Sequence, residues 1–167
     1  MPLERPERWR ELTDRVSLEL GKTASPLEGY TFVLQLCIKP SFHEPVSWTV
    51  FASSQTSDTF VKRVIWDRGH DSERFTNPLE GIKTFWSPEP TMTLVTAQLN
   101  RNEITARLEK LSRVHVGTKM ERLAIVLDGT RYELNVPGIL GENVFKWNDV
   151  RLSEEGQYVA AWTDELR

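Results

Sequence analysis

The sequence predicts an α+β protein in which a largely antiparallel sheet of about six or seven strands carries helices packed on one face. Segments with a residue period of two alternate with segments whose apolar residues recur every three or four positions. Short linkers join most of the strand-like segments, which favours antiparallel hairpins over parallel crossovers. With 167 residues, 39% of them hydrophobic, the chain can bury one core, and we predict a single domain over residues 1–167.

The first predicted helix spans residues 6–20. Pro6 suits the first helical position, where its missing N–H has no partner to lose. Gly21 is a suitable end because glycine readily adopts the conformation that terminates helices. An apolar stripe at spacings of three and four defines the buried side of this helix: Trp9, Leu12, Val16 and Leu20.

Three strands are predicted next. Residues 30–38 alternate in polarity, which predicts a strand with one buried face that ends at Pro40. Residues 46–53 form the second strand, after a short loop. Residues 59–67 fit a helix as well as a strand, and their β-branched and aromatic content favours the strand. The apolar side chains of the first strand share one face in this prediction: Tyr30, Phe32, Leu34, Leu36 and Ile38.

In the middle of the chain the sequence predicts helical segments before and after one strand. Residues 71–83 have helical spacing, with Asp71 as the cap at its start, and Pro78 either divides the segment into two short turns or begins the second one. Residues 90–99 predict a strand. A helix capped near Asn102 follows.

The last third predicts three more strands and a helix. Residues 122–127 and 131–136 flank Asp128-Gly129, and Asp-Gly is a strong signal for a type I′ hairpin turn. A catalytic role for Asp128 is the alternative, and turn chemistry is our interpretation. Residues 143–149 predict another strand and residues 154–166 a final helix. Two groups of three strands would allow a sheet in two parts.

Several phrases occur together in a recognisable order: "WDRGHDSERFTNPLEGI", then "LDGTRYELNV", then "FKW". Over residues 64–162 this pattern resembles small bacterial proteins of the immunity type, which are encoded beside polymorphic toxins. The resemblance implies a protein that binds and occludes a partner protein. It brings no catalytic residue with it.

Composition excludes several classes of function. A net charge of −3 argues against a general nucleic-acid-binding protein, which usually carries a basic face. No apolar run is long enough to span a membrane. The N-terminus is charged where a signal peptide would be apolar, and Cys37 is the one cysteine, so we expect a cytoplasmic protein without disulfides.

Candidate catalytic and metal-binding residues are few. Asp67, His70 and Asp71 lie close in sequence and are weak candidates for binding a divalent metal. The simpler interpretation is a turn followed by a helix, with Asp71 as the cap, and we predict no metal. Cys37 lies within a strand, where a buried cysteine acts as a small hydrophobic residue. No phosphate-binding loop or nucleophile motif occurs, so we predict no cofactor.

Two features favour binding of another protein. Phe85 and Trp86 lie in a proline-bounded loop, where exposed aromatic residues can anchor a partner. Residues 128–167 hold eight acidic and four basic residues, a net charge of −4, which leaves +1 for residues 1–127. This acidic third, with Asp149, Glu154 and Glu155 as contact residues, could attract a basic partner.

We therefore expect a non-catalytic protein-binding module, immunity-like in the specific version. The alternative is a small enzyme or small-molecule-binding protein with a pocket between the sheet and the helices. A deep cavity lined by convergent polar groups would favour this alternative. A flat acidic and aromatic patch would favour protein binding.

The Asp128-Gly129 turn can be tested by substitution. We expect Gly129→Val to lower the melting temperature, because a β-branched residue resists positive φ. Asp128→Asn should leave the melting temperature nearly unchanged, because Asn accepts the same turn. A large loss in Asp128→Asn, with Gly129→Val tolerated, would contradict the turn interpretation.

Overall fold

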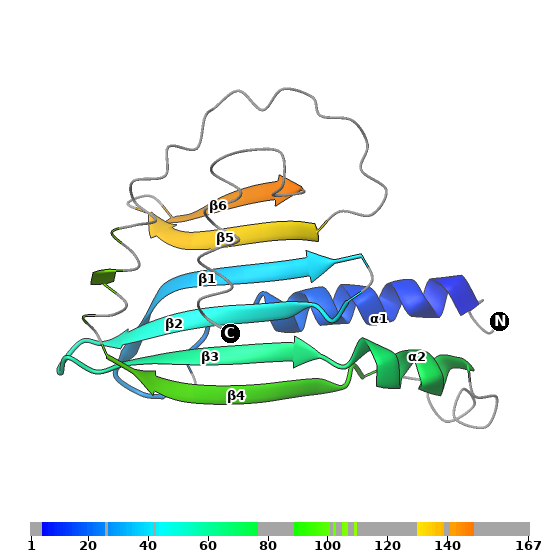
Figure 1. Ribbon diagram of the computed structural model, residues 1–167, viewed down its shortest axis with the longest axis horizontal. Helices are drawn as coiled ribbons and strands as arrows, with labels where there is room; N and C mark the ends of the chain where they lie inside the picture. Colours follow the sequence, from blue (N-terminus) through cyan, green and yellow to red (C-terminus); the bar gives the residue numbers. More distant parts are fainter. Residues whose placement is uncertain are drawn as a thin grey trace.

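A computed structural model describes residues 5–25, 27–41, 43–76, 89–100, 102, 105, 106, 109, 130–138 and 141–148 of the chain. Two helices and six strands lie in these ranges (Figure 1). In chain order they are α1 (Arg5–Leu20), β1 (Tyr30–Pro40), β2 (Val46–Ser53), β3 (Thr59–Trp66), α2 (Arg68–Thr76), β4 (Met92–Leu99), β5 (Thr130–Gly138) and β6 (Gly141–Asn148).

The six strands form one antiparallel sheet in the order β4-β3-β2-β1-β5-β6. This confirms the predicted α+β class and the largely antiparallel sheet. The sheet is continuous, because β1 pairs with β5 from Gln35–Asn135 to Pro40–Thr130. Strands from the two halves of the sequence therefore share one sheet rather than forming two.

α1 covers one face of the sheet, here called the helix face. Leu12, Val16 and Leu20 of α1 are buried there, as predicted, against Cys37, Val64 and Trp66 of the strands. Burial of such side chains is the main contribution that holds a helix on a sheet, at about 1.5–3 kcal/mol for each fully buried apolar side chain.

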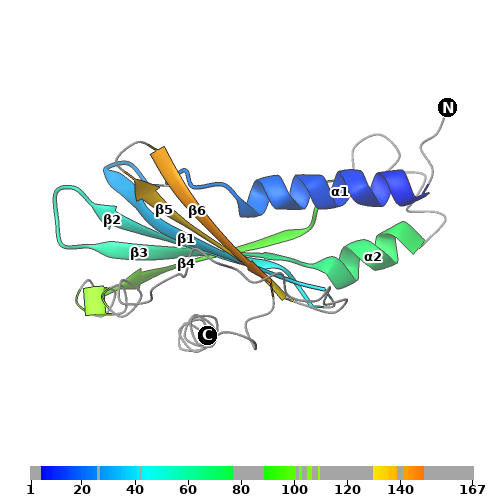
Figure 2. The same cartoon turned by 90° about the horizontal axis from the view of Figure 1, so that it is seen from above.

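α2 follows β3 directly and lies beside α1 at one end of the sheet (Figure 2). Trp9 of α1 and Phe75 of α2 meet edge to face, with ring centroids 5.4 Å apart. Trp9 also contacts Trp66, whose ring centroid is 5.7 Å away. These three rings join the two helices to the end of β3.

The opposite side of the sheet, here called the second face, holds its own buried cluster of Leu34, Leu36, Trp48, Val50 and Val61. The central strands are therefore buried on both faces. The prediction of a single buried face for residues 30–38 is wrong, because Gln35 and Cys37 are also buried, on the helix face.

A β-bulge interrupts the alternation that was predicted for the first strand, so this part of the prediction is wrong. The register of β1 against β2 shifts between Phe32 and Leu34, where Phe32 pairs with Phe51 but Leu34 pairs with Val50. An extra residue in a strand reverses the face of every side chain beyond it. Tyr30 and Phe32 therefore lie on the helix face, opposite Leu34, and Tyr30 packs edge to face on Phe60.

Side chains of the sheet hold the carboxyl end of α1. The Gln35 amide donates hydrogen bonds to the Leu20 carbonyl oxygen at 2.9 Å and to Thr49 Oγ1 at 3.0 Å. The Lys62 ammonium donates to the Lys22 carbonyl oxygen at 3.0 Å and to that of Ala24 at 3.4 Å. Burial, together with the nearby charge of Lys22, lowers the pKa of Lys62 below its usual value. Gln35 thus satisfies a carbonyl group that the helix end leaves without a partner, and Lys62 satisfies two carbonyl groups of the segment just after the helix.

Other predicted elements have different outcomes. The strands predicted at 46–53, 59–67, 90–99 and 143–149 are confirmed, with small shifts of their ends. Within the helix predicted after residue 101, residues 102, 105, 106 and 109 are described and are helical. The Asp128-Gly129 turn, the strand at 122–127, the turn at Pro78 and the helix at 154–166 lie outside the described residues. No helix in the described ranges is long and apolar enough to cross a membrane.

The Gln35 anchor can be tested by Gln35→Leu, which keeps a side chain of similar size. We expect a loss of about 1–3 kcal/mol in the free energy of unfolding, because the Leu20 carbonyl and Thr49 hydroxyl lose a buried partner. Denaturant unfolding measures this change. Gln55→Leu, in the exposed turn after β2, is the matched control and should change it by less than about 0.5 kcal/mol. Equal effects of the two substitutions would contradict the anchoring role.

Candidate functional site

Asp67 and not Asp71 caps α2. The helix begins at Arg68, and Asp67 Oδ1 accepts a hydrogen bond from the His70 backbone N–H at 2.8 Å. The prediction that Asp71 caps the helix is therefore wrong. Gly69 and His70 belong to the first helical turn, where the sequence suggested a turn between strand and helix.

Asp71 is completely buried and accepts four hydrogen bonds. Oδ2 accepts from the Trp66 indole N–H at 2.7 Å and from the Thr91 backbone N–H at 2.9 Å. Oδ1 accepts from Thr91 Oγ1 at 2.7 Å and from Arg74 Nη1 at 2.8 Å. This carboxylate thus ties together the end of β3, the helix α2 and the segment that leads into β4.

The weak metal candidates do not form a ligand set. Asp67 caps the helix, Asp71 uses both carboxylate oxygens in the network just described, and His70 is exposed. Among the described residues, no three His, Cys, Asp or Glu side chains lie close enough together to hold a metal ion.

Cys37 lies on the helix face between β1 and α1, and its Sγ is 3.5 Å from the Leu20 carbonyl oxygen. Burial raises the pKa of its thiol to about 11, with a smaller opposing effect from the charge of Lys39. A thiol is nucleophilic only as the thiolate. At neutral pH Cys37 is therefore protonated, and it packs as the small hydrophobic residue that the sequence predicts.

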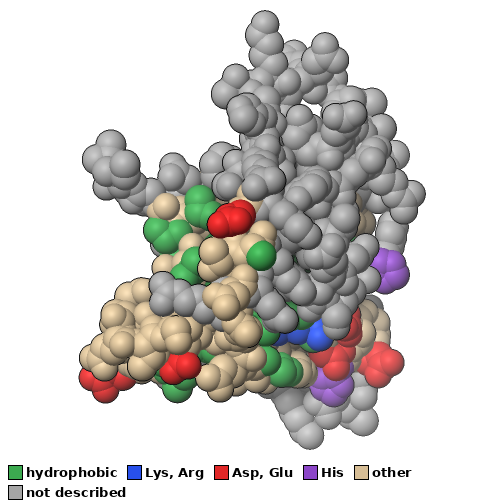
Figure 3. All heavy atoms as spheres, turned by 60° about the vertical axis from the view of Figure 1, so that its left-hand side comes forward, with side chains coloured by type: hydrophobic (Ala, Val, Ile, Leu, Met, Phe, Trp, Pro, Cys, Tyr) green, Lys and Arg blue, Asp and Glu red, His purple; other side chains and the backbone are tan. Residues whose placement is uncertain are grey.

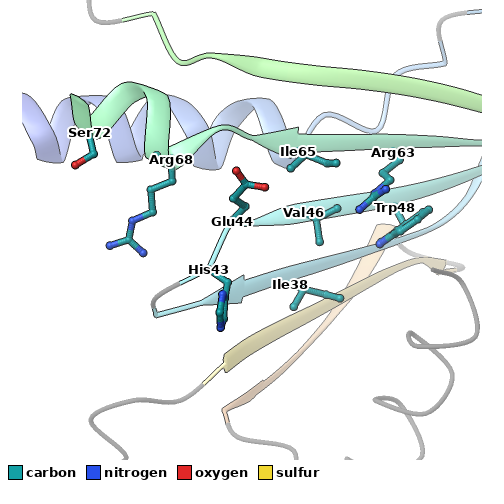
Figure 4. A pocket seen from close by; sticks show the side chains of 10 residues that line it. Ile38, His43, Glu44, Val46, Trp48, Arg63, Ile65, Arg68 and Ser72 are labelled. Carbon is teal, nitrogen blue, oxygen red and sulfur yellow. The ribbon is translucent and has the colours of Figure 1, made fainter. Parts of the chain in front are cut away.

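A cavity of about 720 Å³ opens on the second face beside the start of α2 (Figure 4). This volume lies in the range of small-molecule sites. Apolar side chains of β1, β2 and β3 form its floor: Ile38, Val46, Trp48 and Ile65. Polar residues from β3, α2 and the loop before β2 complete its lining: Arg63, Arg68, Gly69, Ser72, His43 and Glu44.

Two guanidinium groups lie at different ends of this cavity (Figure 4). Arg63 stacks on the Trp48 ring with its guanidinium carbon 4.7 Å from the ring centroid. Arg68 donates a hydrogen bond to the Ser41 carbonyl oxygen. The arrangement offers positive charge beside an apolar surface. Neither arginine stands out in the sequence, although Arg63 follows the same alternation as Val61 and Ile65 and so falls on the second face.

The outer edge of β4 is the other unusual feature. β4 is an end strand of the sheet (Figure 1). Its residues Thr93 to Gln98 are exposed on both faces. Leu94 is 60% and Val95 50% exposed. Its sequence, MTLVTAQL, contains no charged residue and no proline, whereas β6 at the opposite edge carries Glu142 and Lys146. Charged residues and proline are the usual protection of an edge strand.

The predicted partner-binding residues Phe85, Trp86, Asp149, Glu154 and Glu155 lie outside the described residues. On the face in Figure 3, acidic side chains are scattered among hydrophobic and uncharged ones within the described part of the chain.

Glu133 belongs to the acidic third of the sequence, and three cations surround its carboxylate. Lys39 Nζ lies 2.9 Å, Lys146 Nζ 3.4 Å and Arg131 Nε 3.6 Å from its oxygens. Burial alone would raise the pKa of Glu133, but the hydrogen bond and charge of Lys39, with the charge of Lys146, hold it below the usual value. This carboxylate is therefore already paired within the sheet.

Comparison with protein-family models, with curated proteins and with solved structures found no match for this chain.

Substitutions of Asp71 and His70 can distinguish a structural role of the Asp71 network from a metal-binding role. We expect Asp71→Asn to lower the free energy of unfolding by about 3 kcal/mol or more, because the amide replaces one acceptor by a donor that faces N–H and O–H donors. His70→Ala should have little effect, because the His70 side chain is exposed. Thermal unfolding with and without added zinc measures both. Zinc-dependent stabilisation lost in His70→Ala would instead establish a metal site.

Proposed function

We propose that this protein is a non-catalytic binding module that engages another protein through the exposed edge of β4. The observation that carries this proposal is an end strand whose residues 93–98 are all exposed and which contains no charged residue and no proline. An extended segment of a partner can add to such an edge through main-chain hydrogen bonds, while side-chain positions along the strand provide specificity. An immunity-like role, in which the partner is occluded, is the specific form of this proposal.

An extended segment of another protein suits this edge better than a second copy of the chain. Twofold antiparallel pairing of β4 with itself must place side chains of the same face opposite each other. In the two registers with the greatest overlap, Leu94 then faces Thr96 or Gln98 of the other copy. Both registers leave the most exposed apolar side chain of the strand opposite a polar one, whereas a partner segment can present an apolar residue there.

The small-molecule alternative has support from one specific observation, the cavity lined by Arg63 and Arg68. The buried thiol of Cys37 and the fully engaged carboxylate of Asp71 lie on the other side of the sheet, so neither supplies a reactive group to this cavity. A binding role for the cavity is compatible with a protein-binding edge.

Strand addition can be tested with Val95→Lys and its matched control Val144→Lys. Val95 on β4 and Val144 on β6 are 50% and 51% exposed on opposite edges of the sheet. Extended peptides selected against the wild-type protein from a random library provide the probe. We expect Val95→Lys to weaken their binding about tenfold or more, because a charge would be desolvated at the new strand pair. Val144→Lys should leave binding unchanged.

Hydrogen exchange locates the bound peptide. We expect it to slow exchange of amides in residues 92–99, with those in residues 141–148 unaffected. Protection elsewhere would contradict the proposal. A concentration-dependent dimer of the peptide-free protein, lost in Val95→Lys, would assign the edge to a second copy instead.

A further inference from the structure

The cavity on the second face has a definite distribution of charge. Arg63 and Trp48 lie at one end and Arg68 at the other, with Val46 and Ile65 between them (Figure 4). Glu44 is the one carboxylate among its described lining residues. Two guanidinium groups and one carboxylate give a formal charge of +1. The lining can therefore compensate one negative charge of a ligand.

Arg63 carries an unused hydrogen-bond donor. Its Nε is buried and has no acceptor among the described residues. The guanidinium is held in place by stacking on Trp48, at 4.7 Å from the ring centroid. A buried donor without an acceptor is destabilising. Because Nε is closed to the cavity, the two-donor edge that the guanidinium can offer a carboxylate is the pair of Nη groups.

We propose that this cavity binds a small organic acid that carries one carboxylate on an apolar body. Arg63 donates hydrogen bonds to the carboxylate at the Trp48 end, and the apolar body lies over Ile38, Val46 and Ile65. Arg68 adds positive potential from the far end without direct contact. Glu44 disfavours ligands with two or more negative charges. Val95 of the β4 edge does not line the cavity, but it pairs with Arg63 across β3 and β4, so the variants that test this site leave β4 unchanged.

The probes are 3-phenylpropionate and its amide, 3-phenylpropionamide, which share a shape and differ in charge. Titration followed by two-dimensional NMR of the backbone amides measures affinity and location together. We expect the acid to shift the amides of Gly69 and Ser72 and the indole N–H of Trp48. The amide should bind at least about tenfold more weakly, because it loses a charge-assisted hydrogen bond.

Variants of Arg63 identify the carboxylate-binding group. Arg63→Met keeps an apolar stem over Trp48 and should reduce affinity for the acid about tenfold or more, with no change for the amide. Arg63→Lys should restore part of the affinity, since it keeps the charge but loses the two-donor edge. Arg68→Gln should have a smaller effect. Arg15→Gln, on α1 and outside the cavity, is the control and should leave affinity unchanged.

Several outcomes would overturn the proposal. Equal affinity for the acid and the amide would make the cavity an apolar site without charge selection. Inorganic phosphate binding as tightly as the acid would exclude the carboxylate class. Absence of any shift with the acid at about 10 mM, well above the concentration that a weak millimolar site needs, would mean that the cavity does not bind this class. Native melting temperatures and unchanged spectra outside the cavity establish that each variant is folded.

Discussion

The attachment of the carboxyl end of α1 to the sheet is the interaction on which the rest of this structure depends. Gln35 of β1 reaches the carbonyl group of the last helical residue, and Lys62 of β3 reaches carbonyl groups just after the helix. A cation and an amide donor at this helix end satisfy free carbonyls and complement the helix dipole. Both donors come from the sheet and hold the end of the helix against the strands, while Trp9 near its start packs against Trp66.

The two sides of α2 make different contacts. Toward the helix face it holds Asp71, whose carboxylate connects Trp66 with Thr91. Toward the second face it presents Arg68 and Ser72 to the cavity. The buried network therefore also sets the position of one cavity wall. Rigid support of this kind allows a binding site to keep its geometry without a ligand.

The two edge strands of the sheet differ in charge. β6 bears charged residues, and Lys146 is engaged by Glu133 from the neighbouring strand. β4 has uncharged side chains exposed on both faces. The backbone groups of an uncharged exposed edge can pair with a strand of another chain, so proteins usually protect such an edge. Because the β6 edge carries charged residues, the lack of charge on β4 is particular to that strand, and this difference supports a binding role for β4.

The sequence by itself determined the fold class, because local periodicity reports which side chains of a helix or strand are buried together. It placed α1 and its stripe of Leu12, Val16 and Leu20, and it located the described strands to within a few residues. It also indicated that Cys37 is a packing residue, as its burial confirms.

Only the tertiary structure decided which distant segments meet. The pairing of β1 with β5, the bulge after Phe32 and the burial of Gln35 depend on contacts between residues far apart in the chain, which leave no local pattern. The cavity also depends on such contacts, since its lining residues come from β1, β2, β3, α2 and the loop before β2. In the sequence Arg63 and Arg68 are each a single charge within a mixed segment and look like ordinary surface residues, and only the folded chain brings both to the lining of one cavity.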